Sequence, residues 1–521
     1  MPSLLIYAVT ALITYIAYSQ LFALFQTVAH KAPPVAANSW WAFLSGKSVP
    51  GGVLIEQFYE KYSKKNEPFM AGGHYVLPPS VFAAIRKIPD RMANSTPANE
   101  DGLVLEPFLG HDNTDIIHLV RTDLTRSVDA MIAPLKSEIH LTLSTHFLPP
   151  STPPVLLPSS TGSEEEEEWY PLTVHPSTLS AIGRIITRIL VGRKYTLLPA
   201  WTTTLAGFAN GIIIQSFLLR KIPRVLLPLI APLFNTTRRV AKLRALILPD
   251  VRELIANPPP PGTYPDGEPT VLPMMVNYVL SRPGYADAGE DTVLNGVIGR
   301  LLDFSFAAVD TTTITLTHCI HDLVSHPPSE YANPILTQAR SVLASHNGIW
   351  TTQALSSLPL LDSFIKESQR LHPIGQLLSQ RKVLDPAGVT LHPAAGFEGA
   401  KPVHLPYGAV TQMPLYGIHM DAGVYEEPRV FRGFRFAGDK VPSSQPSDRF
   451  MSFGHGKHAC PGRHLALVVV KLFLLEFMER FEFREVERPK DWQLGFMFNA
   501  VPDMKTNVWI RPRREETEVG A

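Results

Sequence analysis

The stretch Phe453-Gly454-His455-Gly456-Lys457-His458-Ala459-Cys460-Pro461-Gly462-Arg463, near the C-terminus, holds one of the two cysteines in 521 residues. Glycine permits positive φ and lets backbone N–H groups approach an atom that a Cβ would block. A loop with glycines on both sides of a cysteine can therefore wrap a thiolate and donate hydrogen bonds to its sulfur, which tunes a bound metal. Pro461 suits the first turn of a helix, and the apolar run 464–475 predicts that helix.

A cysteine alone cannot make a structural zinc site, and Cys319 lies too far upstream to imply a disulfide framework. Two cysteines in such a chain fit a reducing compartment. The alternative interpretation of Cys460 is a buried free cysteine beside a glycine turn.

The stretch resembles the haem-binding signature of the cytochrome P-450 superfamily at every defining position, namely Phe453, Gly454, Gly456, His458, Cys460 and Gly462. The resemblance implies a mainly α fold with small β-sheets (α+β) and haem b held by the Cys460 thiolate as axial iron ligand. It also implies that Phe453 and Gly454 belong to the cofactor-binding loop. Within the superfamily, the chain looks most like fungal microsomal monooxygenases of secondary metabolism, including the ent-kaurene-oxidase-like group.

Residues 3–29 carry no Asp, Glu, Lys or Arg. About 20 apolar residues span a bilayer, whereas a cleaved signal peptide would have a positive start and a shorter apolar core. We therefore expect a membrane anchor over residues 1–30. The first basic residues, Lys31 and Lys47, follow the span and place the remainder in the cytosol; the microsomal resemblance implies the endoplasmic reticulum membrane.

Behind the anchor, we expect a proline-containing linker over 31–50 and one catalytic domain over 51–521. Surface insertions are predicted near 149–169, where five adjacent glutamates repel one another, and near 257–270, which is rich in proline. Residues 94–113, rich in Asn, Asp, Gly and Pro, predict a loop. Equal numbers of basic and acidic residues, 47 each, give no basic field for nucleic acid.

A long apolar helix is predicted over 291–326, and it contains Phe306-Ala307-Ala308-Val309-Asp310-Thr311-Thr312-Thr313. Asp and Thr compete for backbone hydrogen bonds inside a helix, and such local conflicts are expected at functional sites. The alternative is a buried Asp that caps a kink. The segment resembles the family's oxygen-activation motif, which implies catalytic roles for Asp310 and Thr311. Ala308 stands where the family commonly has glycine.

A helix predicted over 361–372 carries Glu367 and Arg370 on one face, a spacing that is common for exposed ion pairs. It resembles the family's Glu-x-x-Arg helix, whose partner arginine would be Arg435. A buried cluster of this kind would fix the geometry of the haem loop rather than add net stability.

Three further residues occupy positions that the family uses to bind the haem propionates: Arg121, in a helix predicted over 116–131, Arg381 and His458. The helix of Arg121 departs from the family pattern, because Ile117 stands where the family commonly has tryptophan. The alternative interpretation of Arg121 is an ordinary exposed arginine. Hypotheses for the substrate pocket, each with simple core packing as the alternative, are Phe304, Ala307, Ala308, Ile374, Leu377 and Phe498.

The resemblance implies a monooxygenase that uses O2 to hydroxylate, epoxidise or otherwise oxidise a hydrophobic small molecule, such as a terpenoid or polyketide intermediate. No Gly-x-Gly-x-x-Gly fingerprint follows a strand, so we expect electrons from NADPH through a separate NADPH-cytochrome P-450 reductase. The alternatives are a haem-thiolate isomerase or dehydratase and a membrane-tethered haem-binding protein without turnover.

Overall fold

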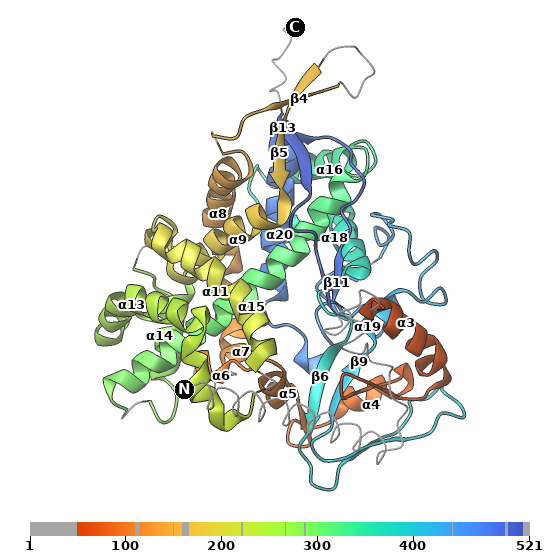
Figure 1. The fold of residues 1–521 in the computed structure, drawn as a ribbon. Coiled ribbons are helices and arrows are strands. Elements are labelled where there is room, and N and C mark those ends of the chain that lie inside the picture. Colours follow the sequence, from red (N-terminus) through yellow and green to blue (C-terminus); the bar gives the residue numbers. More distant parts are fainter. Residues whose placement is uncertain are drawn as a thin grey trace, which may run out of the picture.

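The helix α15, Glu290–Val324, crosses the centre of the molecule (Figure 1). It packs against α9 and α11 on one part of its length and against α18 and α20 further along. The computed structural model describes residues 49–109, 115–149, 151–158, 166–219, 222–265, 267–285, 288–439, 441–494 and 499–513. The predicted anchor over residues 1–30 lies outside the described residues.

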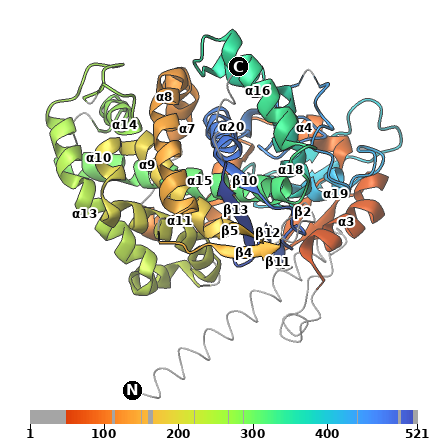
Figure 2. The same cartoon turned by 90° about the horizontal axis from the view of Figure 1, so that it is seen from above.

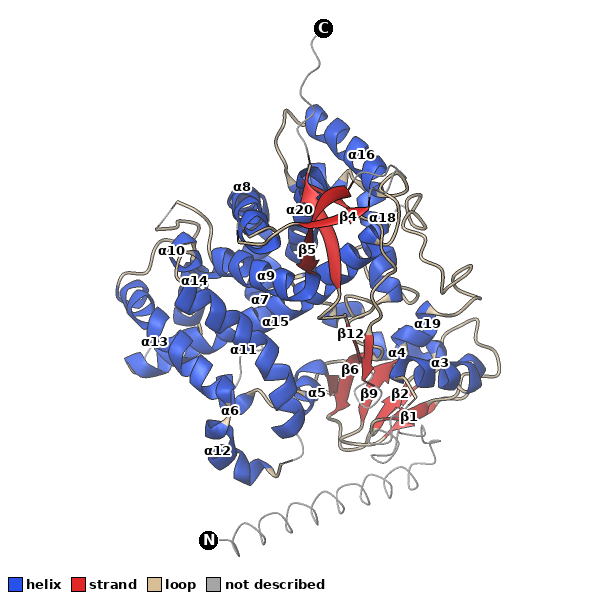
Figure 3. Ribbon diagram, turned by 45° about the horizontal axis from the view of Figure 1, so that its top comes forward, coloured by secondary structure: helices blue, strands red, loops and turns tan. Residues whose placement is uncertain are grey.

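Most of the helices form a body to one side of the main sheet, whereas α3, α4 and α19 lie beside the sheet itself (Figure 3). The α-helices are α3 Gly51–Lys61, α4 Phe82–Lys87, α5 Ser95–Gly102, α6 Glu106–Leu109, α7 Ile116–Leu119, α8 Thr125–Thr142, α9 Val174–Val191, α10 Arg193–Thr196, α11 Pro199–Leu219, α12 Leu227–Ile230, α13 Asn235–Ala256, α14 Val271–Leu280, α15, α16 Ala332–Ser345, α17 Thr352–Ser356, α18 Pro359–Leu371, α19 Leu415–His419 and α20 Arg463–Arg480. Single π-helical segments at Val120–Leu124 (η3) and Leu143–Phe147 (η4) flank α8. Short 3-10 turns are η1 Ser63–Lys65, η2 Pro79–Val81, η5 Arg224–Leu226, η6 Ala231–Leu233 and η7 Gly456–His458.

The strands form small sheets. One five-stranded sheet has the order β1-β2-β9-β6-β3, with β2 and β9 parallel and the other pairs antiparallel. Its strands are Phe69–Ala71, His74–Val76, Val410–Met413, Leu378–Val383 and Ala93–Asn94. A four-stranded sheet has the order β10-β13-β5-β4, with strands Phe481–Phe483, Asn507–Pro512, Glu166–Thr173 and Val155–Pro158. Two hairpins complete the set: β11 Trp492–Leu494 with β12 Asn499–Val501, and β7 Val389–Leu391 with β8 Val403–Leu405. The predicted mainly α fold with small β-sheets is confirmed.

The largest hydrophobic core joins α8, α9, α11, α15, α18 and α20. A helix that is apolar on every side must be buried on every side, and α20 is buried along most of its length, as its sequence predicts. Seen from above, α15 and α20 lie in the middle, with α13 and α14 at one edge and α3 and α19 at the other (Figure 2). Among the described helices, only α15 is long and apolar enough to cross a membrane, and 67% of that window is buried in protein. It is a core helix.

One prediction about a loop is wrong. Residues 94–113 contain α5 and α6 rather than a loop. Asn94 caps α5, because its side chain accepts a hydrogen bond from the Thr96 N–H at 3.0 Å. Within the surface insertion predicted near 149–169, β4 pairs with the start of β5, and β5 continues to pair with β13.

Candidate active site

The loop that carries Cys460 is shaped by its glycines. Gly454 has φ 83° and donates its N–H to the Met451 carbonyl at 2.7 Å. Gly456 has φ 61°, and a Cβ there would lie 2.8 Å from Cγ of Arg86. The loop closes where the Cys460 N–H donates to the Phe453 carbonyl at 2.8 Å. Glycine can adopt the positive φ of these two positions and leaves room for the neighbouring atoms without strain.

Cys460 keeps accessible surface even though it sits deep in the protein, at the start of α20. Burial raises the pKa of its thiol, while backbone N–H groups of Gly462 and Arg463 and the Arg463 charge lower it. These donors stabilise the thiolate form, which is the form that binds a metal. Cys319 is fully buried in α15, and burial raises its thiol pKa to about 12, so it cannot fill this role.

Residues far apart in the sequence hold the loop in place. Arg121 lies in η3 and donates from Nη2 to the Lys457 carbonyl at 2.6 Å. The Lys457 ammonium donates to the Ile88 carbonyl at 2.9 Å and pairs with Asp90 at 2.7 Å. The structure thus brings Arg121 to the Cys460 loop, and its side chain is exposed.

His458 is already engaged by the protein. Its Nδ1 contacts the Ser95 hydroxyl at 2.8 Å and its Nε2 contacts Asp90 at 3.0 Å. Burial lowers its pKa, and the nearby Arg381 charge lowers it further. Both ring nitrogens therefore have protein partners, which favours a role in fixing the loop over direct binding of a propionate.

Arg381, on β6, offers a donor that has no partner in the part of the chain that the structure describes. Its side chain is 1% exposed, and its Nη1 donates to the Ile85 carbonyl. Among the described residues nothing accepts from its Nη2, and the nearby Ser379 hydroxyl is also buried without a partner. A buried guanidinium without an acceptor is costly, so this position calls for an anionic group.

The distal side of the site is a stripe of accessible residues on the otherwise buried α15. Ala307 and Thr311 are exposed, and Phe306, Ala308 and Ile314 are partly exposed, although the helix lies in the core. Ala307, Thr311 and Ile314 stand at i, i+4 and i+7, so these three residues share one face of the helix. This face is surface that the packed side chains of the core leave uncovered.

Thr311 donates its hydroxyl hydrogen to the Ala307 carbonyl at 2.7 Å. This leaves the lone pairs of the hydroxyl free to accept from a water or a substrate. Asp310 is 8% exposed, and burial raises its pKa to about 6. The pair therefore places an acceptor on the accessible face of α15, next to an acid that can exchange a proton near neutral pH.

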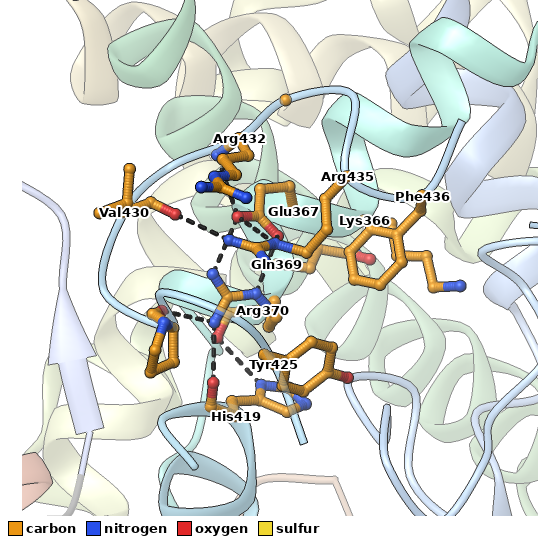
Figure 4. A network of polar contacts seen from close by, with 12 residues as sticks. Lys366, Glu367, Gln369, Arg370, His419, Tyr425, Val430, Arg432, Arg435 and Phe436 are labelled. Carbon is orange, nitrogen blue, oxygen red and sulfur yellow. Dashed lines mark hydrogen bonds and ion pairs between the residues drawn. The ribbon is translucent and has the colours of Figure 1, made fainter. Parts of the chain in front are cut away.

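Glu367, Arg370 and Arg435 form a buried network (Figure 4). Arg370 donates from Nε and Nη2 to the two carboxylate oxygens of Glu367, each at 2.8 Å. Arg435 donates from Nε to the same oxygens at 3.0 and 3.1 Å. Nη1 of Arg370 also donates to the carbonyls of His419 and Pro428, each at 2.7 Å. The network ties α18 to the segment 419–435 that leads to the Cys460 loop.

The residues predicted to line the substrate pocket differ in how much of their surface is accessible. Ala307, Ala308 and Ile374 keep accessible surface. Phe304 and Leu377 are 9% and 7% exposed and pack in hydrophobic clusters, which favours the core alternative for both. Phe498 lies outside the described residues.

The sequence analysis missed a second polar cluster, next to α15. His372 contacts Asp322 through Nε2 at 3.3 Å and Asp491 through Nδ1 at 3.0 Å. Arg488 pairs with the same two carboxylates at 2.5 and 3.1 Å and contacts His318 at 3.1 Å. Ligand atoms of His318, His372 and Asp491 lie within 4.8 Å of one another. The guanidinium of Arg488 would repel a cation there, so the cluster is an ion-pair network rather than a metal centre.

Comparison with known proteins agrees with this site. A model of the family "Cytochrome P-450" matches residues 287–504, which include α15, the Glu367 network and the Cys460 loop. The chain is 26% identical over 493 residues to an ent-kaurene oxidase of Fusarium fujikuroi, covering 89% of this chain and 84% of that protein. It is 26% identical over 455 residues to cytochrome P-450 monooxygenase 103 of Postia placenta, covering 84% and 83%.

The fold is also similar to the crystal structure of the cytochrome P-450DA heme domain. The TM-score is 0.63 at 14% identity, over 93% of this chain and 98% of that one. The residues here fit the cofactor of such proteins. Cys460 keeps accessible surface, and Arg381 has a buried donor, without an acceptor among the described residues, that suits a propionate.

Proposed function

The chain belongs to the cytochrome P-450 superfamily of haem-thiolate monooxygenases, and on that premise we propose that it oxidises a hydrophobic intermediate of fungal secondary metabolism. Electrons would come from NADPH through a separate reductase. The observation that carries the proposal is the pairing of two accessible sites within the core. One is Cys460, in the loop that leads into α20, and the other is Thr311 on α15, a helix that also contacts α20.

When bound, haem with a thiolate ligand activates dioxygen for insertion into C–H or C=C bonds. Cys460 would hold the iron, and Arg381 would neutralise a propionate through its free Nη2. Arg121 and the Glu367 network would keep the loop in the geometry that binding requires.

Residues of α15 would supply the protons that the reaction needs. The Thr311 hydroxyl can accept a hydrogen bond from a water beside this face, since its own hydrogen goes to Ala307. Asp310 can hand protons to such a water, because its carboxyl is deep and titrates near neutral pH. A haem-thiolate isomerase or dehydratase would have no need of this pair.

We place the protein on the endoplasmic reticulum membrane, with residues 1–30 as anchor and the catalytic domain in the cytosol. The segment η5–α12–η6, Arg224–Leu233, supports membrane contact. Val225, Leu229 and Leu233 are 80%, 72% and 74% exposed there. Three adjacent apolar side chains in water are unfavourable, and each contributes about 1.5–3 kcal/mol when buried in an apolar phase.

The substrate class rests on the relatives. The named ent-kaurene oxidase and the fungal monooxygenases support an apolar terpenoid or polyketide for this chain. The accessible stripe of α15 is lined by Ala307, Ala308 and Ile314, which suits an apolar ligand.

The test is reconstitution of the haem-loaded protein with NADPH, a fungal P-450 reductase and isotopically labelled dioxygen, against terpenoid and polyketide extracts of the host. The proposal expects NADPH-dependent products that carry one labelled oxygen atom. Products that form equally well without NADPH would establish the isomerase or dehydratase instead.

A further inference from the structure

His372 joins three segments that are far apart in the sequence. It directly follows α18, and its ring nitrogens face Asp322 on α15 and Asp491, which directly precedes β11. Each segment leads to a part of the predicted site. The helix α15 carries the oxygen-activation motif, Ile374 follows His372 by two positions, and Phe498 directly precedes β12, the partner strand of β11. The contacts of His372 therefore decide how these segments are held together.

These contacts require His372 to carry a positive charge. Its Nδ1 lies 3.0 Å from Oδ2 of Asp491, and its Nε2 lies 3.3 Å from Oδ1 of Asp322. Carboxylate oxygens only accept hydrogen bonds and a neutral imidazole has one N–H, so only the imidazolium form suits both contacts. Burial lowers the pKa of His372, but the two carboxylates outweigh it and raise the pKa above its ordinary value.

The neighbouring His318 is in the opposite state. Its ring stacks on that of His372, with the centroids 5.0 Å apart. Its Nδ1 lies 3.1 Å from Nη2 of Arg488, and a guanidinium can only donate, so this nitrogen accepts and the ring is neutral. Burial lowers the pKa of His318 well below its ordinary value. The stacked pair thus holds one positive charge, on His372.

Asp491 depends on that charge. Arg488 pairs with Asp491 at 3.1 Å, but both residues belong to the segment that leads into β11. Because His318 is neutral, His372 is the only cation from another segment that pairs with Asp491 in the described chain. A neutral His372 could donate to only one carboxylate and would turn a lone pair toward the other. Arg488 would still hold Asp322, whereas Asp491 would lose its contact with α18.

Solvent can exchange protons with His372. The residue lines two cavities, of about 750 and 260 Å³, and shares both walls with Leu371 and Arg429. Arg429 is itself paired with Glu56. The other titratable or charged residues of the two walls are Asp322, His326, Arg484, Glu485, Glu487 and Arg488 in the larger cavity and Tyr416 and Asp491 in the smaller one.

We propose that His372 is a positioning residue whose proton holds Asp491, and with it β11, against the junction of α15 and α18, and that loss of this proton releases the strand. Since the pKa of His372 is raised, the contact is fully present below about pH 6.5 and is lost as pH rises through the pKa of the folded protein. Phe498, predicted to line the substrate pocket, belongs to the segment that would be released.

Amide hydrogen exchange of the haem-loaded full-length protein tests this in the peptide that contains Trp492–Leu494, from about pH 6 to pH 9, after correction for the intrinsic effect of pH. In the wild type, exchange is expected to become roughly ten- to a hundredfold faster once His372 is neutral, because a hydrogen bond between charged groups is lost. His372→Gln should exchange fast at every pH. His372→Lys keeps the charge and should stay protected throughout.

His326→Gln is the matched control, because His326 lines the larger cavity and its Nδ1 contacts the Asp322 carbonyl rather than a carboxylate. It should keep the wild-type pH profile. A wild type whose exchange in β11 does not change with pH, or a His372→Lys variant that loses protection as the wild type does, would overturn the proposal. These two profiles decide the matter even if His372→Gln does not fold.

The exchange of β11 does not require turnover. Normal NADPH-dependent oxidation with a flat exchange profile would therefore overturn the role of His372 alone. The expected profile in a protein without NADPH-dependent products would overturn only the proposed function.

Discussion

Glu367 and Arg370 form a bidentate ion pair in which both side chains are 0% exposed, and Arg435 completes the network from the opposite side of the carboxylate. Each carboxylate oxygen of Glu367 accepts at least two hydrogen bonds. Oε1 accepts a further one from the Arg432 N–H at 3.1 Å. Burying these charged groups costs desolvation energy, so the cluster serves to fix the geometry of the chain around it. It holds the segment before the Cys460 loop at a fixed distance from α18.

Replacing Glu367 with Gln should leave two buried guanidinium groups without a counter-charge. Breaking a buried pair in this way costs about 3–5 kcal/mol, and we expect a matching loss in the free energy of unfolding by urea together with loss of haem from the purified protein. Glu479→Gln is the matched control. It breaks the exposed Arg340 pair and should cost no more than about 1 kcal/mol. Equal effects in the two variants would contradict the structural role of the network.

Thr311→Ala tests proton supply. The variant removes the hydroxyl on the accessible face of α15 while the helix and the Cys460 loop stay intact, so haem spectrum and substrate binding should be retained. Without an ordered water, NADPH consumption should be diverted from product to hydrogen peroxide, and general acid assistance of roughly 10²–10⁴-fold should be lost from product formation. Product and peroxide are measured per NADPH consumed. Thr313→Ala, on a buried face of the same helix, serves as the control, and unchanged coupling in Thr311→Ala would remove the residue from the mechanism.

The His372 network predicts a dependence of stability on pH. Burial alone would lower the pKa of His372, but Asp322 and Asp491 outweigh it and raise the pKa above the usual value. A raised pKa means that protonated His372 stabilises the fold fully below about pH 6.5, and that this contribution is lost as pH rises through the folded pKa. The free energy of unfolding should therefore fall more between pH 6 and pH 8.5, roughly the range around this pKa, in the wild type than in His372→Asn. An identical slope in both proteins would show that His372 does not carry the charge.

The exposed segment Arg224–Leu233 should bind lipid without the N-terminal anchor. A protein that lacks residues 1–30 is expected to sediment with phospholipid vesicles after a salt wash. The triple variant Val225→Ser, Leu229→Ser, Leu233→Ser should be released, because each serine removes about 1.5–3 kcal/mol of apolar burial. Val430→Ser and Val441→Ser, at two other exposed apolar positions, should leave binding unchanged. A truncated protein that stays soluble beside the vesicles would leave residues 1–30 as the sole anchor.

The sequence predicted the features that depend on local spacing. Glycines at 454 and 456 predicted the turns around Cys460, and the apolar pattern predicted α15 and α20. It failed where a distant partner decides the structure. Residues 94–113 look like a loop by composition, yet α5 and α6 form there, and α5 packs against β6, almost 300 residues later in the sequence.

The sequence analysis missed the cluster of His372, Asp322, Asp491 and Arg488 because its members lie far apart in the sequence and only the folded chain brings them together. Arg381 was predicted, but a sequence cannot show that its Nη2 has no acceptor among the described residues, because that depends on the folded chain.

Cys460→Ser tests the central claim most directly. Binding of carbon monoxide to the reduced wild-type protein should give the red-shifted Soret band of thiolate ligation, and Cys319→Ala should keep it, because Cys319 is buried away from the site. We predict that Cys460→Ser loses this band. Retention of the band in Cys460→Ser would contradict the assignment of the axial ligand and the function built on it.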